Sequence, residues 1–212
     1  MKQIVINRVL EWYQENGRSF PWRKDKRSPY EILVAEILLQ KTRAETVEKV
    51  YESFLDHLPS LEVLNSSDFE EIESHLSGLG LQNRRAKWLK EIAEKLINEN
   101  DGKIPQSEEK IKKLPGVGLY IGNAVLTFAF SKKKPILDAN TSRVLGRMHS
   151  INYKGDLRRK KRLKKKAKEI LPDEHIKKFN WALLDIGAIL CHRNNPECSK
   201  CPFSKECNFK GA

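Results

Sequence analysis

A short turn, Leu114-Pro115-Gly116-Val117-Gly118, constrains this chain more than any other segment, because it carries one proline and two glycines in five residues. Glycine reaches backbone angles that other residues avoid, so such a turn leaves its peptide N–H groups unobstructed. The apolar residues 119–130 that follow are predicted to form a helix. N–H groups at a helix start, aided by the helix dipole, form a site for one phosphate. The turn is therefore either a phosphate site or an ordinary corner between two helices.

Two acidic residues stand next to apolar runs. Asp138 follows Ile136-Leu137 and precedes a predicted helix over residues 141–148, so its carboxylate either caps that helix or performs chemistry. Glu36 interrupts the strongly apolar predicted helix 30–39, where burying a carboxylate without a partner is costly. Glu36 therefore lies either on a polar edge of that helix or in a functional pocket.

The rest of the chain is typical of an all-α protein. Apolar residues recur at helical spacing in segments of roughly 10 to 15 residues between prolines and glycines, without an alternating strand pattern. The length of 212 residues suits one large domain or two smaller lobes. Asp185, in the apolar predicted helix 181–190, is expected to make a structural hydrogen bond or salt bridge.

The charge balance favours a polyanionic partner. Lys and Arg number 40 against 28 Asp and Glu, which gives a net charge of +12. The run 158–168 holds nine basic residues in eleven and is either a DNA contact or a solvated helix face. No run reaches the roughly 18 apolar residues of a membrane span, and the amphipathic, acid-containing start is unlike a signal peptide. We therefore expect an intracellular protein without membrane contact.

All four cysteines lie near the end of the chain, with the spacing C-x6-C-x2-C-x5-C from Cys191 through Cys198 and Cys201 to Cys207. In a reducing compartment such clustering favours metal over disulfides. Zinc sites usually combine two close pairs of ligands, and here only Cys198 and Cys201 are so paired. From the residues alone, an iron–sulfur cluster and zinc both remain open.

The turn and Asp138, about twenty residues apart, together resemble the helix–hairpin–helix/Gly-Pro-Asp superfamily of DNA base-excision glycosylases. The cysteine spacing resembles the endonuclease III branch, which implies a 4Fe-4S cluster. The resemblance implies two helical lobes with a DNA cleft between them. One would span residues 24–130, with the helix–hairpin–helix at about 108–130. The other would join residues 1–23 to 131–212 and end in the cluster loop 191–207.

The resemblance also implies roles for individual residues. Asp138 would be catalytic, lining the cleft and facing the hairpin, and Glu36 would reach the base pocket, where desolvation raises the pKa of a carboxyl and suits a proton donor. Leu81 would wedge into the base stack, although an apolar residue is usually core. Arg85 and Lys87 are plausible phosphate contacts or else solvated charges. The implied DNA contacts are Gln40, Lys41, Leu81, Gln82, Asn83, Arg84, Leu114, Gly116, Val117, Gly118, Asn140 and Arg143.

One departure from the family pattern concerns Tyr120. Bifunctional members of the endonuclease III branch carry a lysine at this position, two residues after the turn, and its amine forms a Schiff base that leads to strand nicking. Tyrosine cannot form one. We therefore predict a monofunctional glycosylase, with Tyr120 packed beside the extruded sugar or base; the alternative is an aromatic on the helix surface.

Two mismatch subfamilies share tyrosine here: archaeal-type thymine glycosylases and MutY adenine glycosylases. The segment GLGLQNRRA lacks the tyrosine pair usual in MutY, and Asp138-Ala139-Asn140 resembles the thymine version. MutY also normally carries an extra C-terminal domain, which these residues do not include. We expect removal of thymine or uracil opposite guanine. The alternatives are a MutY-like enzyme acting on adenine opposite guanine or 8-oxoguanine, and a non-catalytic DNA-binding module. The expected partner is double-stranded DNA with a mismatched or damaged base, bound by a monomer in the cytoplasm near the nucleoid.

Overall fold

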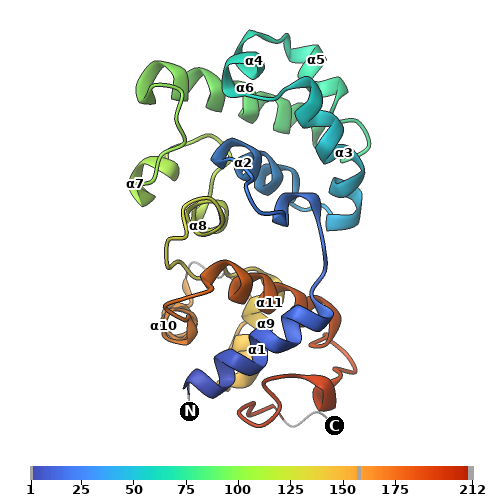
Figure 1. The fold of residues 1–212 in the computed structure, drawn as a ribbon, viewed down its shortest axis with the longest axis vertical. Helices are drawn as coiled ribbons and strands as arrows, with labels where there is room; N and C mark the ends of the chain where they lie inside the picture. Colours follow the sequence, from blue (N-terminus) through green and yellow to red (C-terminus); the bar gives the residue numbers. More distant parts are fainter. Residues whose placement is uncertain (1, 157–158, 210–212) are drawn as a thin grey trace. The chain divides into compact units, whose positions relative to one another are not determined.

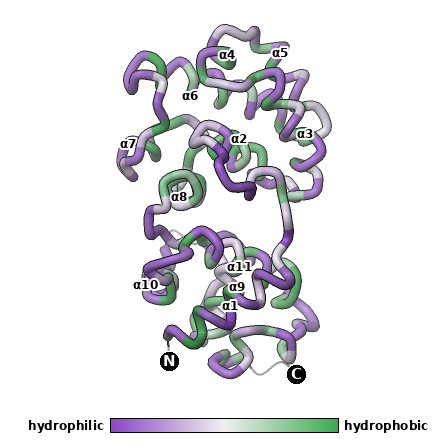
Figure 2. The backbone as a smooth tube through the Cα atoms, in the orientation of Figure 1, coloured by the Kyte–Doolittle hydropathy of each residue, from purple (hydrophilic) through white to green (hydrophobic). Residues whose placement is uncertain are grey.

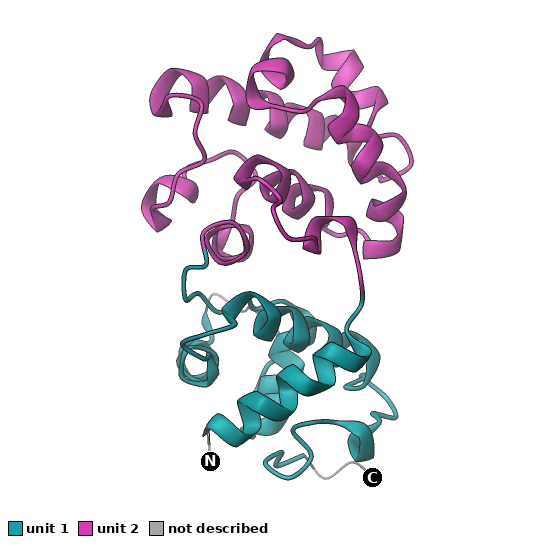
Figure 3. Cartoon of the chain, viewed as in Figure 1, with its two compact units in different colours: residues 1–18, 131–212 teal, residues 19–130 magenta. Residues whose placement is uncertain are grey.

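The computed structural model describes residues 2–156 and 159–209, and these residues form helices and loops without a strand (Figure 1). The chain divides into two compact units (Figure 3). We call Ser19–Phe130 the central unit, and Met1–Arg18 with Ser131–Ala212 the terminal unit. The all-α prediction is therefore confirmed.

The central unit is built on two apolar helices, α2 (Pro29–Leu38) and α8 (Leu119–Phe128), which pack against each other. Ser28 starts α2 with a capping box, since its hydroxyl accepts from the Glu31 N–H and the Glu31 carboxylate accepts from the Ser28 N–H. Figure 2 shows α8 as a mostly hydrophobic helix, and every residue from Ile121 to Phe128 is buried. The other elements are η1 (Pro21–Arg23), α3 (Ala44–His57), α4 (Leu61–Ser66), α5 (Phe69–Ser74), α6 (Gln82–Asn100) and α7 (Glu108–Ile111).

The terminal unit is built on α11 (Ile176–Ile189), which packs against α1 (Lys2–Asn16) and α9 (Ala139–Met148). Asp185 of α11 is fully buried and accepts hydrogen bonds from the Arg18 backbone N–H (2.9 Å) and side-chain Nε (2.8 Å). The predicted structural salt bridge of Asp185 is thereby confirmed. The unit also contains α10 (Lys161–Ile170) and a short turn, η3 (Cys198–Lys200).

Helix α10 accounts for most of the basic run. Its apolar residues Leu163, Ala167 and Ile170 are buried, and its basic side chains are largely exposed, which gives the helix one apolar side. Figure 2 shows α10 as mainly hydrophilic. Residue 158, the first of the basic run, lies outside the described residues. DNA binding by the run stays a prediction.

The boundary between the units falls between Arg18 and Ser19 rather than between residues 23 and 24. The reason is aromatic packing: Phe20 stacks on Trp22 with ring centroids 4.9 Å apart, and Trp22 meets Tyr51 of α3 edge-on at 5.5 Å. These contacts hold the stretch before α2 in the central unit. Within the described residues, none of the helices combines the length and apolar character that crossing a membrane requires.

Candidate functional site

The turn between α7 and α8 presents backbone rather than side chains. Leu114 and Val117 are buried at 4% and 5% exposure, and the Val117 N–H donates to the Leu114 carbonyl at 3.1 Å. Gly116 has φ +71°, and Gly118 is exposed at the N-terminal end of α8. Leu114 and Val117 thus anchor the turn through their side chains. Any DNA contact by these two residues would use their peptide groups.

Gly116 is held from two sides within the central unit. The Gln40 side-chain amide donates to the Gly116 carbonyl at 2.9 Å. A Cβ added at Gly116 would lie 2.5 Å from Trp88 Cδ2, so the indole of α6 closes the space where a side chain would be. Gln40 is therefore engaged with the turn in this structure, and a contact between Gln40 and DNA would have to replace that bond.

Two loops of the central unit carry left-handed residues. Lys41, after α2, and Leu81, before α6, both have φ +54°, and Leu81 follows Gly78 and Gly80, which also have positive φ. Such a backbone costs about 1–3 kcal/mol for a residue other than glycine and is common at functional sites. Leu81 is 44% exposed, so the interpretation of Leu81 as a core residue is wrong. Lys41 is exposed as well.

The first turn of α6 divides into exposed and buried residues. Gln82, Asn83 and Arg84 are exposed, and the Arg84 guanidinium lies 5.9 Å from the centre of the Trp88 ring. Arg85 is fully buried, so both earlier interpretations of Arg85, a phosphate contact or a solvated charge, are wrong. Burial lowers the pKa of the Arg85 guanidinium from its usual value. Lys87 is exposed near Glu91, with 3.9 Å between Nζ and Oε1.

Glu36 and Tyr120 lie on the two central helices. Glu36 is only 3% exposed, among the buried residues of α2, so the alternative of an exposed polar edge is wrong. Tyr120 is the second residue of α8 and is half-buried. Both residues belong to the central unit, in which α2 packs against α8.

Asp138, in the terminal unit, is the N-cap of α9. Its Oδ1 accepts from the Thr141 N–H (2.7 Å) and the Thr141 hydroxyl (2.9 Å), while the Asp138 N–H donates to that hydroxyl (2.9 Å). No hydrogen bond within the described part of the chain engages Oδ2. The two interpretations of Asp138 are therefore compatible, because capping orients one oxygen and leaves the other for chemistry.

Asn140 and Arg143 contact each other inside the terminal unit. Arg143 Nη2 donates to Asn140 Oδ1 (2.9 Å) and to the Gly187 carbonyl (2.6 Å), and Arg143 Nε donates to the Cys191 carbonyl (2.6 Å). Gly187 permits this approach, because an added Cβ would lie 2.8 Å from Asn140 Cβ. A DNA contact by Arg143 would have to use its Nη1.

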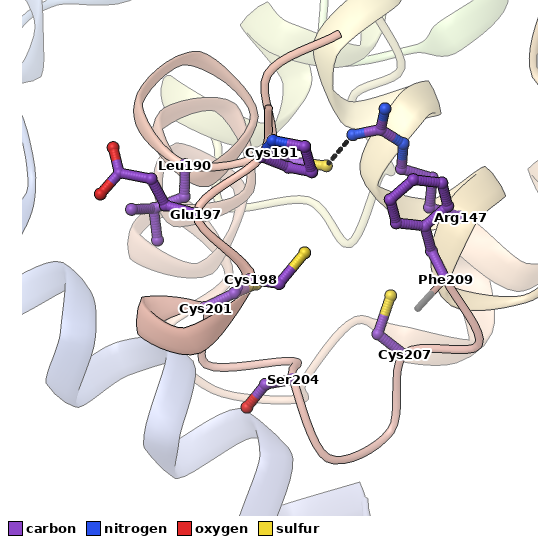
Figure 4. Close-up of a pocket in the computed structure, with 10 residues that line it drawn as sticks. Arg147, Leu190, Cys191, Glu197, Cys198, Cys201, Ser204, Cys207 and Phe209 are labelled. Carbon is purple, nitrogen blue, oxygen red and sulfur yellow. Dashed lines mark hydrogen bonds between the residues drawn. The ribbon is translucent and has the colours of Figure 1, made fainter. Parts of the chain in front are cut away.

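The four cysteines line one pocket with Arg147 and Phe209 (Figure 4). All four are free thiols, and Figure 4 shows the sulfurs of Cys191, Cys198 and Cys207 pointing into a common space. Arg147 Nη1 donates to Cys191 Sγ at 3.3 Å, and the Arg147 guanidinium lies 4.3 Å from the centre of the Phe209 ring. Burial raises the pKa of Cys201 to about 11. Four cysteine thiols line one pocket, and the guanidinium of Arg147 lies beside them. This lining fits a positively charged group that is bound by cysteine thiolates.

Sequence reasoning missed several supporting residues. Arg147 is four positions after Arg143, and this spacing places both arginines on one face of α9. The spacing could have indicated from the sequence that Arg147 supports the same region as Arg143. Thr141 follows Asp138 at capping-box spacing and could also have been found. No local pattern indicated that Trp88 would cover Gly116.

Comparison with known proteins identifies relatives along nearly the whole chain. The family model described as HhH-GPD superfamily base excision DNA repair protein matches residues 34–173. A thymine/uracil-DNA glycosylase of Methanothermobacter thermautotrophicus is 36% identical over 208 residues, covering 98% of this chain and 94% of the relative. An adenine DNA glycosylase of Buchnera aphidicola is 38% identical over 205 residues, covering 96% of this chain and 58% of the relative.

Solved structures agree on the fold. A thermostable thymine-DNA glycosylase superposes with a TM-score of 0.90 at 36% identity, covering 97% of this chain and 94% of that one. A non-covalent endonuclease III–DNA complex superposes with a TM-score of 0.81 at 22% identity, covering 98% of this chain and 95% of that one. At the lower identity the likeness concerns the fold alone.

Proposed function

Because the chain belongs to the HhH-GPD superfamily of base excision DNA repair proteins, we propose that it is a monofunctional DNA glycosylase that removes thymine or uracil mispaired with guanine. The observation that carries this proposal is Asp138, whose Oδ1 is fixed by Thr141 while no described residue forms a hydrogen bond with Oδ2. The specificity for thymine and uracil is supported by the name of the Methanothermobacter relative, a thymine/uracil-DNA glycosylase of which this chain covers 94%.

Asp138 would act on the sugar. Breaking the bond between C1′ and the base passes through an oxocarbenium-like state, which a nearby carboxylate stabilises by its charge. The two hydrogen bonds that Asp138 Oδ1 accepts from Thr141 hold the carboxylate in one orientation before the substrate arrives, so no reorganisation is needed during the reaction. Oδ2 would then face either the developing cation or the attacking water.

Glu36 and Tyr120 would contact the extruded nucleotide. Glu36 is 3% exposed on α2, and we assign it the proton transfer to the departing base. Tyr120 takes the position of the Schiff-base lysine, so the reaction would end at an intact abasic site. This is the support for a monofunctional enzyme.

DNA binding would rest mainly on backbone groups and exposed side chains of the central unit, with two further residues from the terminal unit. The N–H groups from Gly116 to the first turn of α8 would hold one phosphate. Exposed Leu81 would fill the space left by the extruded nucleotide, with Gln40 and Lys41 reaching the duplex from the other loop. Gln82, Asn83 and Arg84 would contact the DNA from the start of α6, and Asn140 and Arg143 from α9. We propose that a monomer binds mismatched double-stranded DNA in this way.

The four cysteines would hold a 4Fe-4S cluster. Among the described residues, no three His, Cys, Asp or Glu side chains converge as a single metal ion requires, although all four thiols line one pocket. The spacing of the cysteines, in which only Cys198 and Cys201 form a close pair, is what favours a multi-iron cluster over a single zinc ion. When bound, the cluster would supply fixed charge and a covalent link between the end of α11 and the C-terminal loop. Arg147 would offset thiolate charge through its bond to Cys191.

The test is excision from labelled duplexes that carry G:T, G:U, A:G, A:8-oxoG or thymine glycol, each analysed with and without alkali. Strand breaks at G:T and G:U that require alkali are expected. Release of adenine would instead support the second candidate, which the Buchnera relative favours. Breaks without alkali would contradict the monofunctional proposal. An absence of excision on all duplexes, with DNA binding retained, would indicate a binding module.

A further inference from the structure

Two loops of the central unit, residues 39–42 and 78–81, meet at the buried side chain of Arg85. Arg85 Nη2 donates to the Gln40 carbonyl and to the Thr42 hydroxyl, both at 2.7 Å. Arg85 Nη1 donates to the Leu79 carbonyl at 3.0 Å and also to the Gly80 carbonyl. The Thr42 hydroxyl completes the connection by donating to the Leu79 carbonyl at 3.1 Å. One guanidinium therefore joins loops that are about forty residues apart in the chain.

Two of these acceptors occupy equivalent positions in the two loops, each in the peptide before the left-handed residue. The Gln40 carbonyl belongs to the peptide that leads into Lys41, and the Gly80 carbonyl belongs to the peptide that leads into Leu81. Lys41 and Leu81 are the left-handed residues of the two loops, each with φ +54°. A left-handed conformation outside glycine persists only where the surroundings impose it. Arg85 bonds to the peptide immediately before each of them and so supplies that constraint.

The positive charge of Arg85 is surrounded by uncharged hydrogen-bond acceptors. Its four acceptors are backbone carbonyls and a hydroxyl, all uncharged, although the side chain is fully buried. Arginine remains protonated, and a buried charge is costly unless its donors are satisfied. These acceptors engage both terminal nitrogens, while Nε has no hydrogen-bond partner among the described residues. None of the acceptors cancels the positive charge, which therefore remains beneath the two loops. A positive charge there suits a surface that approaches DNA.

The same helix also supports the phosphate-binding turn. Trp88, three positions after Arg85, covers Gly116, and Gln40 of the first loop donates to the Gly116 carbonyl. Side chains from one end of α6 thus contact the two loops and the turn. All of these residues belong to the central unit.

We propose that Arg85 is a positioning residue that locks the peptides before Lys41 and Leu81, so that both loops enter the DNA as one rigid element. Arg85 does not touch the DNA. This inference rests on the proposed function, because it concerns how the enzyme extrudes a nucleotide. Its effect should appear in extrusion and excision, while binding through phosphate contacts is preserved.

The first test measures the loops in the protein without DNA, by amide hydrogen exchange in wild type, Arg85→Lys and Thr42→Val. Lysine keeps the charge but cannot reach two loops with a planar fork, and valine removes the shared hydroxyl. Exchange in residues 39–42 and 78–81 is expected to rise together by about tenfold, as expected for loss of a charge-assisted bond. Unchanged exchange in both variants would overturn the proposal. If Arg85→Lys fails to fold, Thr42→Val alone decides.

The second test measures extrusion with 2-aminopurine beside the mismatch, in an Asp138→Asn background that prevents excision. Arg85→Lys is expected to reduce the fluorescence increase on binding about tenfold and to leave the salt dependence of affinity unchanged. Arg84→Ala is the matched contrast, since loss of an exposed phosphate contact lowers the salt slope by about one. A lower salt slope in Arg85→Lys with normal extrusion would overturn the proposal. Failure of wild type to excise any base would contradict the proposed function instead, and the exchange result would still test the loops.

Discussion

The two units hold their candidate functional groups in different ways. In the terminal unit the groups are single side-chain atoms at the ends of helices: Oδ2 of Asp138 before α9 and the thiols after α11. In the central unit the proposed DNA contacts depend on backbone segments, shaped by Gly116, by Leu81 and by buried Arg85. A single-atom change should therefore be decisive in the terminal unit, whereas a change of backbone shape should be decisive in the central unit.

Asp138→Asn should have the largest effect. Asparagine caps a helix about as well as aspartate, so the bond to the Thr141 N–H and the melting temperature should be preserved. Loss of the negative charge should lower single-turnover excision about 10³-fold, while mismatch affinity stays close to wild type. Gel-shift titration and quenched-flow excision measure the two quantities. A large fall in the melting temperature of Asp138→Asn would mean that Asp138 serves the fold rather than the chemistry.

Cys198→Ser should have the next largest effect. Loss of one cluster ligand should remove iron and the visible absorbance of the purified protein, and lower the melting temperature by about 10 °C. Ser204→Ala is the matched control, because Ser204 lines the same pocket without a thiol. Iron analysis and thermal unfolding provide the measurements. Zinc in place of iron in wild-type protein purified without air would contradict the cluster proposal.

Gly116→Ala tests whether the shape of the backbone is decisive in the central unit. The new Cβ would lie 2.5 Å from Trp88 at a residue with φ +71°, so unfolding should become easier by about 2 kcal/mol or more. At Gly118 none of the described residues lies within 4 Å of an added Cβ and φ is −85°, so Gly118→Ala should change stability by less than about 1 kcal/mol. Denaturant unfolding compares the two variants. Equal free energies of unfolding for Gly116→Ala and Gly118→Ala would show that the turn tolerates another backbone conformation.

Leu81→Ala should produce the smallest effect in free energy. Because Leu81 is 44% exposed, its truncation should change stability by no more than about 0.5 kcal/mol. Excision at a mismatch should fall about tenfold if the side chain occupies the space left by the extruded nucleotide. Val63→Ala, at another exposed apolar residue, is the control. Equal excision by both variants would remove Leu81 from the proposed DNA contacts.

Helical periodicity was enough to predict an all-α chain, because apolar spacing reports local geometry directly. Helix ends were less accurate. The helix predicted over residues 141–148 begins at Ala139, since Asp138 and Thr141 form the cap, and the helix predicted over 119–130 ends at Phe128. A periodic pattern locates the middle of a helix, whereas capping and packing decide its ends.

Local chemistry was readable from the sequence: the glycine turn, the aspartate at a helix start, tyrosine in place of lysine, and four closely spaced cysteines each depend on residue type and short spacing. Which side chains of the central unit are buried and which are exposed was not readable from the sequence. Glu36 and Arg85 are buried, and Leu81 is exposed, because each depends on which segments meet from distant parts of the chain. Arg85 looks in sequence like its neighbour Arg84. Only tertiary structure placed one guanidinium among four acceptors from two loops and left the other in solvent, since burial of a charge is decided by the partners that the fold brings to it.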